Sequence, residues 1–174
     1  MQPAGPLMKE HRLIERAVPV LRRRGEALDA GGAPDGNLLR KLIDFFRSYV
    51  DRCHHGKEED ILFAALGGKD LTDEHRATMD RLVHDHEQAR QAVAAIADAL
   101  EEGQSGAAGE RIAERLGALA ELYAEHIRVE DKEFFLPAMG YLDDDEQQQM
   151  LEAFARFDRN LYHERYEGLM SELE

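Results

Sequence analysis

The sequence predicts an all-α protein, in which an up-down-up-down four-helix bundle is followed by an additional C-terminal helix. Clusters of glycine and proline divide the chain into five segments of helical length. Alanine, leucine, glutamate and arginine are frequent, and these residues favour helices. No segment shows the alternating apolar pattern of a β-strand over a useful length. Short connections make neighbouring helices antiparallel, so residues 1–174 are expected to form a single domain with the bundle over about 7–140.

The first two predicted helices are separated by the segment GGAPDG. The first runs over about 7–29, and Pro19 is expected to kink or divide it, because proline removes a backbone hydrogen bond. The second runs over about 37–66 and ends at GGKD, where two glycines disfavour further helix.

The remaining predicted helices begin at acidic or hydroxyl residues. The third runs over about 73–102, and Thr72 or Asp73 can cap its first turn. The fourth runs over about 110–136 and is expected to end at Pro137. The fifth begins in LDDDE, whose carboxylates suit the positive end of a helix, and covers about 143–174. It lies outside the bundle, where it is expected to cover one end or to mediate a homodimer.

The charge and the cysteine count restrict the partners and the compartment. The formal net charge is −14, which argues against nucleic acids and anionic membranes because their phosphates would be repelled. The single cysteine, Cys53, excludes an intramolecular disulfide and fits a reducing compartment. The first residues lack the apolar core of a signal peptide, and no segment is apolar enough to span a membrane. A cytoplasmic protein is therefore expected.

A weak internal repeat relates the two halves of the bundle. EHRLIERAV at 10–18 resembles DHEQARQAV at 85–93, and HHGKEEDILFAALG at 54–67 resembles HIRVEDKEFFLPAMG at 126–140. Each aligned pair contains a histidine. At 100° per residue, each of these histidines falls on the apolar stripe of its helix. The four inward histidines are His11, His54, His86 and His126.

Two glutamates accompany these histidines. Glu58 follows His54 by four residues and Glu130 follows His126 by four, so each pair shares one helix face. A buried carboxylate without a partner is costly, and a metal ion removes that cost. A lone inward histidine is more often a hydrogen-bonded core residue, but four at one level with two such glutamates favour a metal site. Six ligands are too many for one tetrahedral zinc and suit two ions bridged by both glutamates. Imidazole with carboxylate fits iron, with manganese or zinc as the alternatives.

Four other residues are weaker candidates. His55 with Glu59 repeats the spacing of four but lies away from the upstream apolar stripe, so it is the fallback ligand pair. Glu15 follows His11 by four and is expected behind the ligands rather than among them. His163 is interpreted as structural, and whether it or Glu15 joins the site stays open.

The order His11, His54-x-x-x-Glu58, His86, His126-x-x-x-Glu130 resembles the hemerythrin-like, or HHE cation-binding, domain family. HHGKEEDILF and HIRVEDKEFFLP carry the resemblance, which covers about residues 7–140. It implies a non-haem di-iron centre, with an oxo or hydroxo bridge, inside a four-helix bundle. Oxygen carriers of this family have five histidines and two carboxylates, and here their paired histidines on the third helix would require a histidine at Leu82 or Arg90. That departure argues against simple reversible oxygen carriage.

These observations leave three functional hypotheses. The first is a di-iron protein that binds or senses oxygen, nitric oxide or peroxide, and is a binding protein rather than an enzyme. The second is a di-iron enzyme that consumes peroxide or donates iron for cluster repair, with Tyr49 and Tyr123 as helpers. The third is an iron store, or a bundle whose polar core holds no metal.

Overall fold

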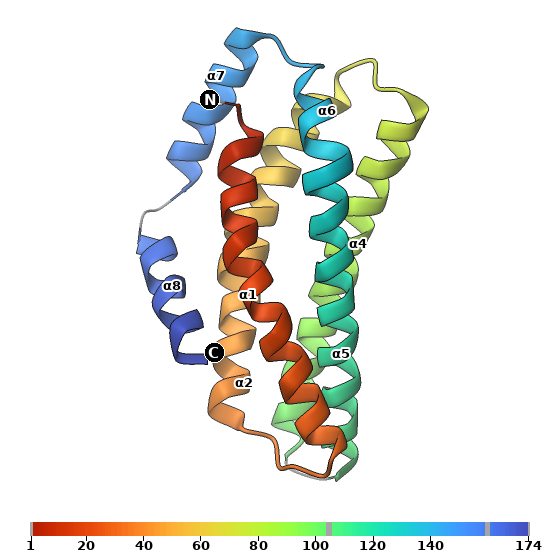
Figure 1. The fold of residues 1–174 in the computed structure, drawn as a ribbon, viewed down its shortest axis with the longest axis vertical. Coiled ribbons are helices and arrows are strands. Elements are labelled where there is room, and N and C mark those ends of the chain that lie inside the picture. Colours follow the sequence, from red (N-terminus) through yellow and green to blue (C-terminus); the bar gives the residue numbers. More distant parts are fainter. Residues whose placement is uncertain (1, 104–105, 159–160, 174) are drawn as a thin grey trace.

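A computed structural model describes residues 2–103, 106–158 and 161–173, together with their side chains except those of residues 161–165. Throughout these ranges the regular structure is helical and contains no strand, so the predicted all-α class is confirmed. Four helical runs alternate in direction and form the bundle (Figure 1). In chain order the four runs are α1 (Ala4–Asp29), α2 to α3 (Gly36–Gly67), α4 (Asp73–Glu101) and α5 to α6 (Gly106–Met139).

The second and fourth runs change between α- and π-helix along their length. The second consists of α2 (Gly36–Asp44), η1 (Phe45–His55), η2 (Glu58–Phe63) and α3 (Ala64–Gly67). The fourth consists of α5 (Gly106–Val129), η3 (Glu130–Phe134) and α6 (Phe135–Met139). A π-helix has i→i+5 hydrogen bonds and therefore more residues per turn than an α-helix. The π segments contain or border the histidine and glutamate pairs singled out from the sequence.

Both prolines that were expected to interrupt helices lie inside them. Pro19 is exposed within an unbroken α1, where its neighbours Val18 and Val20 are buried against the bundle. Pro137 falls in the first turn of α6 rather than ending the fourth run at residue 136. Pro137 thus lies near the C-terminal end of a continuous helical run, and only Ala138 and Met139 follow it in α6. In α1, the burial of Val18 and Val20 outweighs the cost of the backbone hydrogen bond that Pro19 cannot donate.

The predicted fifth helix is two helices, α7 (Asp144–Phe157) and α8 (Leu161–Leu173). Asp143 caps α7 and forms a reciprocal capping box with Glu146. Asp158 has the extended backbone angles φ −78° and ψ 112°, which end α7. In Figure 1 the two helices run along one side of the bundle, beside α1 and α2. The predicted additional helical segment after the bundle is confirmed, and residue 158, which leaves helical geometry, divides it into α7 and α8.

The interior contains two apolar clusters with a polar layer between them. The upper cluster, at the top in Figure 1, includes Leu7, Leu62, Leu82 and Phe135, and the lower cluster includes Ile14, Val50, Ala89 and Tyr123. The predicted histidines lie between residues of the two clusters along every run of the bundle. Helix α7 packs against the upper cluster through Phe154, and α8 packs against the lower cluster through Tyr166. The apolar clusters thus close the polar layer from above and below.

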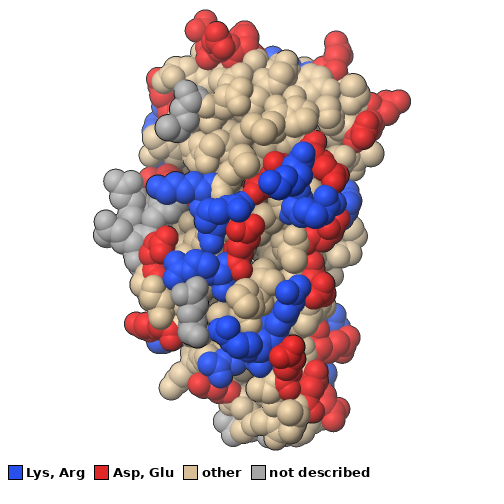
Figure 2. Space-filling model, in the orientation of Figure 1, with Lys and Arg blue, Asp and Glu red and all other residues tan. Residues whose placement is uncertain are grey.

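The surface charges are not uniformly distributed despite the net charge of −14. On the face shown in Figure 2, lysine and arginine gather across the middle, with aspartate and glutamate between them. Arg16 and Arg22 of α1 form ion pairs with Glu167 and Glu121, respectively. Within the described residues, no helix is both long and apolar enough to cross a membrane.

Candidate metal centre

The four predicted histidines face one another in two pairs within the polar layer. The Nε2 atoms of His11 and His54 are 2.9 Å apart, and those of His86 and His126 are 3.1 Å apart. All four side chains are buried. Each comes from a different run of the bundle, and each presents Nε2 to the interior. The structure therefore brings these four residues to one level, as their positions in the helices predicted.

Glu58 and Glu130 lie between the two histidine pairs. The Oε1 atom of Glu58 is 3.2 Å from Nε2 of His54, and its Oε2 atom is 3.4 Å from Nε2 of His86. The Oε2 atom of Glu130 is 3.1 Å from Nε2 of both His11 and His126. Each carboxylate thus contacts one histidine from each pair. This is the placement that a bridging carboxylate between two ions requires.

These carboxylates are buried without hydrogen bonds. In the described part of the chain, none of the four oxygens of Glu58 and Glu130 has a hydrogen-bond partner. Burial and the neighbouring Glu58 raise the pKa of Glu130, but the charge of His126 and the approach of His11 lower it to about 2. A buried, ionised and unbonded carboxylate is costly unless positive charge lies beside it. The donor set therefore fits a bound cation.

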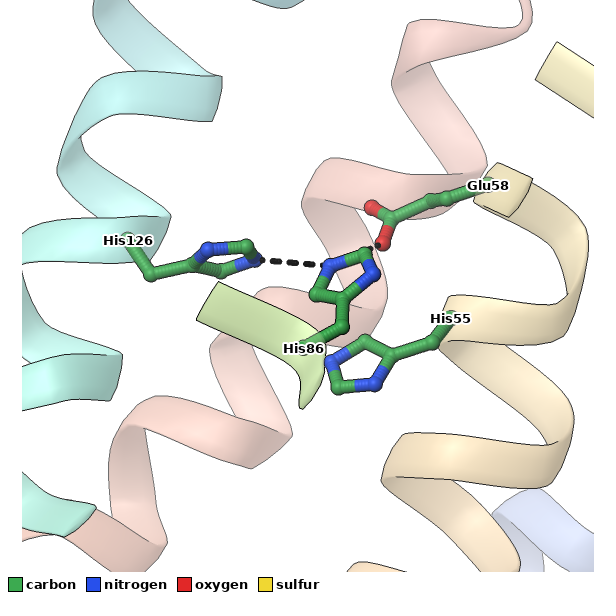
Figure 3. A group of neighbouring side chains, drawn as sticks. All are labelled: His55, Glu58, His86 and His126. Atoms are coloured by element: carbon green, nitrogen blue, oxygen red, sulfur yellow. Dashed lines mark hydrogen bonds and ion pairs between the residues drawn. The ribbon is translucent and has the colours of Figure 1, made fainter. Parts of the chain in front are cut away.

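His55 also lies in this centre, contrary to the prediction that it faces away. Its side chain is 1% exposed and neither ring nitrogen has a hydrogen-bond partner in the described residues. Its ring stacks on that of His86 with centroids 3.7 Å apart (Figure 3). The prediction assumed 100° of rotation per residue from the upstream stripe. The π-helical backbone of η1 turns less at each residue, so consecutive histidines His54 and His55 both reach the interior.

The side chains form two overlapping ligand groups, each with donor atoms within 4.8 Å of one another. One group consists of His11, His54, Glu58 and Glu130, and the other consists of His55, Glu58, His86 and His126. Figure 3 shows the second group, with His126, His86 and Glu58 converging and His55 beneath His86. Glu58 belongs to both groups. Five histidines and two carboxylates are thus available for two cations that share a carboxylate.

A ring of four outer carboxylates surrounds the paired histidines. Each one lies 2.7 to 3.4 Å from the Nδ1 atom of a histidine on a different run, where a protonated Nδ1 donates to it. The pairs are His11 with Asp131, His54 with Glu10, His86 with Glu59, and His126 with Asp85. With the proton held on Nδ1, the inward Nε2 keeps its lone pair for a metal. The ring therefore orients the four histidines and fixes the tautomer of each neutral imidazole.

Basic residues neutralise the outer carboxylates in turn. Arg12 pairs with Asp131, and Arg90 pairs with Glu59 at 2.6 Å. Arg81 lies 3.8 Å from Asp85. A fourth cation, Lys57, is buried and pairs with Glu10, while its Nζ atom is 3.6 Å from Asp158. Since Lys57 also lies near the break between α7 and α8, it connects that segment to His54 through Glu10.

In the absence of a metal ion, the pKa values of His54 and His126 are raised and that of His55 is lowered. Burial lowers the pKa of His54, but the Glu58 and Glu10 carboxylates raise it to about 9. Burial likewise lowers the pKa of His126, which Glu130 and Asp85 raise to about 10. Burial and the neighbouring His86 lower the pKa of His55 well below its ordinary value. Without a metal the centre therefore holds protons on His54 and His126, while His55 stays neutral.

The other candidates have different positions. Glu59 is not paired with His55 but lies behind His86, and it is partly exposed. Glu15 is also partly exposed and pairs with Arg12 at 3.0 Å, outside the centre. The expectation that Glu15 stands directly behind a ligand was therefore wrong, and Glu10 has that position beside His54. The side chain of His163 lies outside the described residues.

Among the outer carboxylates, only Glu59 was singled out from the sequence, as a partner of His55, and Lys57 was not singled out, although a signal exists. Every outer carboxylate is the chain neighbour of a predicted ligand: Glu10 precedes His11, Glu59 follows Glu58, Asp85 precedes His86, and Asp131 follows Glu130. Each serves a histidine on another run. An acidic residue beside a ligand, repeated four times, could have indicated the ring.

Comparisons with known proteins agree with this geometry. The hemerythrin HHE cation binding domain matches residues 3–136, which contain the two ligand groups and the outer ring. No curated protein and no solved structure matches the chain. Because the matched region covers most of the chain and includes all seven inward side chains, the protein belongs to the hemerythrin family of HHE cation-binding domains.

Proposed function

We propose that the protein is a non-haem di-iron protein that binds or senses a small ligand such as oxygen, nitric oxide or peroxide. The observation that carries the proposal is the pair of buried carboxylates, Glu58 and Glu130, which lack hydrogen bonds and lie between two sets of imidazoles. Imidazole and carboxylate together favour iron among the available metals, and manganese or zinc are the alternatives.

Seven side chains would hold the ions. His11 and His54 would bind the first, His55, His86 and His126 would bind the second, and both glutamates would bridge them. Iron in such a site supplies a change of oxidation state and a coordination position for a small molecule. The remaining residues position and insulate the ligands. The outer ring directs the Nε2 atoms inward, and the apolar clusters restrict water, which adjusts the redox behaviour of the site.

Metal analysis with optical spectroscopy tests this proposal. Protein purified with iron should contain two iron ions per chain, and its absorption spectrum should change when oxygen, nitric oxide or peroxide is added to the reduced form. Steady consumption of peroxide would favour the enzymatic alternative over binding or sensing. A purified, folded protein that takes up no metal and whose melting temperature does not respond to chelators would contradict the proposal and support a metal-free polar core.

A homodimer through the C-terminal segment would have to use residues other than the buried face of α8. Helix α8 buries Tyr166 and Met170 against its own bundle, so these side chains do not provide a dimer surface. Leu136 on α6 and Phe157 on α7 are the large apolar residues that stay exposed in the described chain. Sedimentation analysis of the wild-type protein would decide whether a dimer forms.

A further inference from the structure

Arg90 on α4 donates hydrogen bonds to two carboxylates of the second helical run. Its Nε atom lies 2.6 Å from Oδ1 of Asp51, and its Nη2 atom lies 2.6 Å from Oε1 of Glu59. Asp51 belongs to η1 and Glu59 to η2, so one guanidinium joins α4 to both π segments of that run. Arg90 also follows His86 by four residues, which places these two side chains on one face of α4.

The carboxylate oxygens that accept from Arg90 also face two imidazoles of the second ligand group. Oε1 of Glu59 is 2.7 Å from Nδ1 of His86, and Oδ1 of Asp51 is 3.5 Å from Nδ1 of His55. The rings of these two histidines stack with centroids 3.7 Å apart (Figure 3). The arginine, the two carboxylates and the two stacked rings therefore form a closed cycle of contacts on one side of the group.

This cycle gives His55 an outer carboxylate of its own. The Nδ1 atom of His55 lies 3.5 Å from Asp51, without a hydrogen bond to it or to another described residue. With Nδ1 directed toward Asp51, Nε2 is the nitrogen that remains for a metal ion, and a proton on Nδ1 would be donated to the carboxylate. Asp51 thus stands behind His55 as Glu59 stands behind His86.

Burial does not explain the ion pairs of Arg90. The side chains of Arg90, Asp51 and Glu59 have exposed fractions of 36%, 34% and 27%. Ion pairs at such positions contribute little to stability, because water competes for the charges. The planar fork of arginine offers donors to two carboxylates at once, whereas a lysine ammonium is a single point charge. The consequence of these pairs is therefore the position of two carboxylates behind the stacked imidazoles.

The other outer carboxylates have separate cations. Each pairs with a different basic residue: Asp131 with Arg12, Glu10 with Lys57, and Asp85 with Arg81. Among the residues that the structure describes, Arg90 is the cation that contacts the carboxylates of two ligand histidines. A change at Arg90 therefore reaches the second ligand group and bypasses the first.

We infer that Arg90 is a positioning residue for the second metal ion, and that it holds the imidazoles of His55 and His86 toward that ion through Asp51 and Glu59. The inference rests on the two-ion centre of the proposed function and is independent of the small ligand that the centre binds. The positive charge of Arg90 by itself opposes a bound cation. A weaker second site after its removal thus distinguishes positioning from charge.

Stepwise loading with cobalt(II) tests the inference without iron. In Arg90→Met protein the second ion should bind about tenfold or more weakly in competition with a chelator, while the first ion binds as in the wild type. The visible absorption that is lost should match the absorption lost in His55→Phe protein. Arg90→Lys keeps the charge without the fork and should show the same defect. Wild-type or tighter binding of the second ion in either variant would overturn the inference, and so would equal weakening of both ions.

A combined variant tests whether Arg90 acts through the two carboxylates. Asp51→Asn together with Glu59→Gln should weaken binding of the second ion. Adding Arg90→Met to that protein should cause little further loss, because residues that act as one unit are not additive. A further loss as large as that of Arg90→Met alone would overturn the role of the carboxylates.

The matched control is Arg76→Met. Arg76 is an exposed arginine on α4 and belongs to neither ligand group, so this variant should bind both cobalt ions as the wild type does. A defect equal to that of Arg90→Met would overturn the inference. A wild-type protein that binds a single cobalt ion would refute the inference together with the two-ion centre. If two ions bind but the iron-loaded protein responds to no oxygen, nitric oxide or peroxide, only the proposed ligand binding fails.

Discussion

Lys57 and Glu10 form an ion pair in the interior of the bundle, with exposed side-chain fractions of only 1% and 4%. Glu10 also accepts a hydrogen bond from Nδ1 of His54 at 2.9 Å. A buried lysine requires such a partner, because an unpaired buried charge is strongly unfavourable. The pair therefore has two roles: it keeps Lys57 charged in the interior, and it orients a proposed metal ligand.

The substitution Glu10→Gln is expected to weaken metal binding by about 10- to 100-fold, because the orienting carboxylate of His54 is lost. It should also destabilise the metal-free protein by roughly 3–5 kcal/mol, since Lys57 would lose its buried partner. Metal titration and thermal unfolding measure the two effects. Glu15→Gln is the control, because Glu15 is partly exposed and pairs only with Arg12 among the ion pairs described here. Equal effects of the two substitutions would contradict the role of Glu10.

Replacement of His55 tests whether it serves the second ion. His55→Phe retains a buried ring but removes both nitrogens, so the protein is expected to keep the first ion and to bind the second at least about tenfold more weakly. Metal content and competition with a chelator would show this. The control is His84→Phe. The imidazole of His84 is 63% exposed, and it contacts Glu87 and Gln88 rather than a member of either ligand group. Two ions bound with wild-type affinity in His55→Phe protein would remove His55 from the ligand set.

Metal binding should release protons and should tighten as the pH rises. In the metal-free protein the pKa of His54 is raised to about 9 and that of His126 to about 10, so both are protonated at neutral pH. A metal ion requires the neutral imidazole and displaces these protons. Calorimetry in buffers of different ionisation enthalpy would count the protons released. A metal affinity that falls between pH 7 and 9 would contradict this arrangement.

The same histidines give the metal-free protein the opposite pH dependence. Groups whose pKa is raised above the ordinary 6.5 stabilise the fold fully below that pH, and this stabilisation is lost as the pH rises through 9 to 10. Glu130, with its pKa lowered to about 2, stabilises the fold above 4.5 and loses that effect as the pH falls toward 2. Thermal unfolding of the metal-free protein should therefore show the highest stability between about pH 4.5 and 6.5, and lower stability at more acidic and at more alkaline pH. A melting temperature that rises steadily from pH 7 to 10 would disagree with the raised pKa values.

Cys53 is expected to be unreactive in the folded protein. Burial raises the pKa of its thiol to about 12, with Glu10 and Asp158 adding to the effect and Lys57 opposing it. The thiolate is the reactive form, so almost none is present near pH 8. Labelling with iodoacetamide should be slow in the native protein and rapid after unfolding in urea. Fast native labelling would indicate that the segment around Asp158 opens readily.

The sequence was sufficient to predict the bundle and the level of the metal centre, because helical periodicity and the internal repeat depend on local spacing. His11, His54, His86 and His126 were placed correctly for that reason. His55 was misplaced because a π-helix cannot be distinguished from an α-helix by apolar spacing, and its smaller rotation per residue changes which side chains face inward.

The outer ring and the C-terminal break could not be predicted by the same reasoning. Glu10 acts on a histidine 44 residues away, so its role depends on how two runs of the bundle align. The break at Asp158 follows a helix whose sequence has no glycine or proline nearby, and tertiary contacts with Lys57 and Cys53 accompany it. Tertiary alignment, rather than local propensity, determines both features.

The central claim is that five histidines and two glutamates hold two metal ions in the polar layer. Anomalous diffraction from crystals of the iron-loaded protein, recorded on both sides of the iron absorption edge, tests it most directly. We predict two anomalous peaks per chain, one beside His11 and His54 and one beside His55, His86 and His126, with Glu58 and Glu130 between them. A single peak elsewhere, or none in a protein that was incubated with iron and is correctly folded, would contradict the claim.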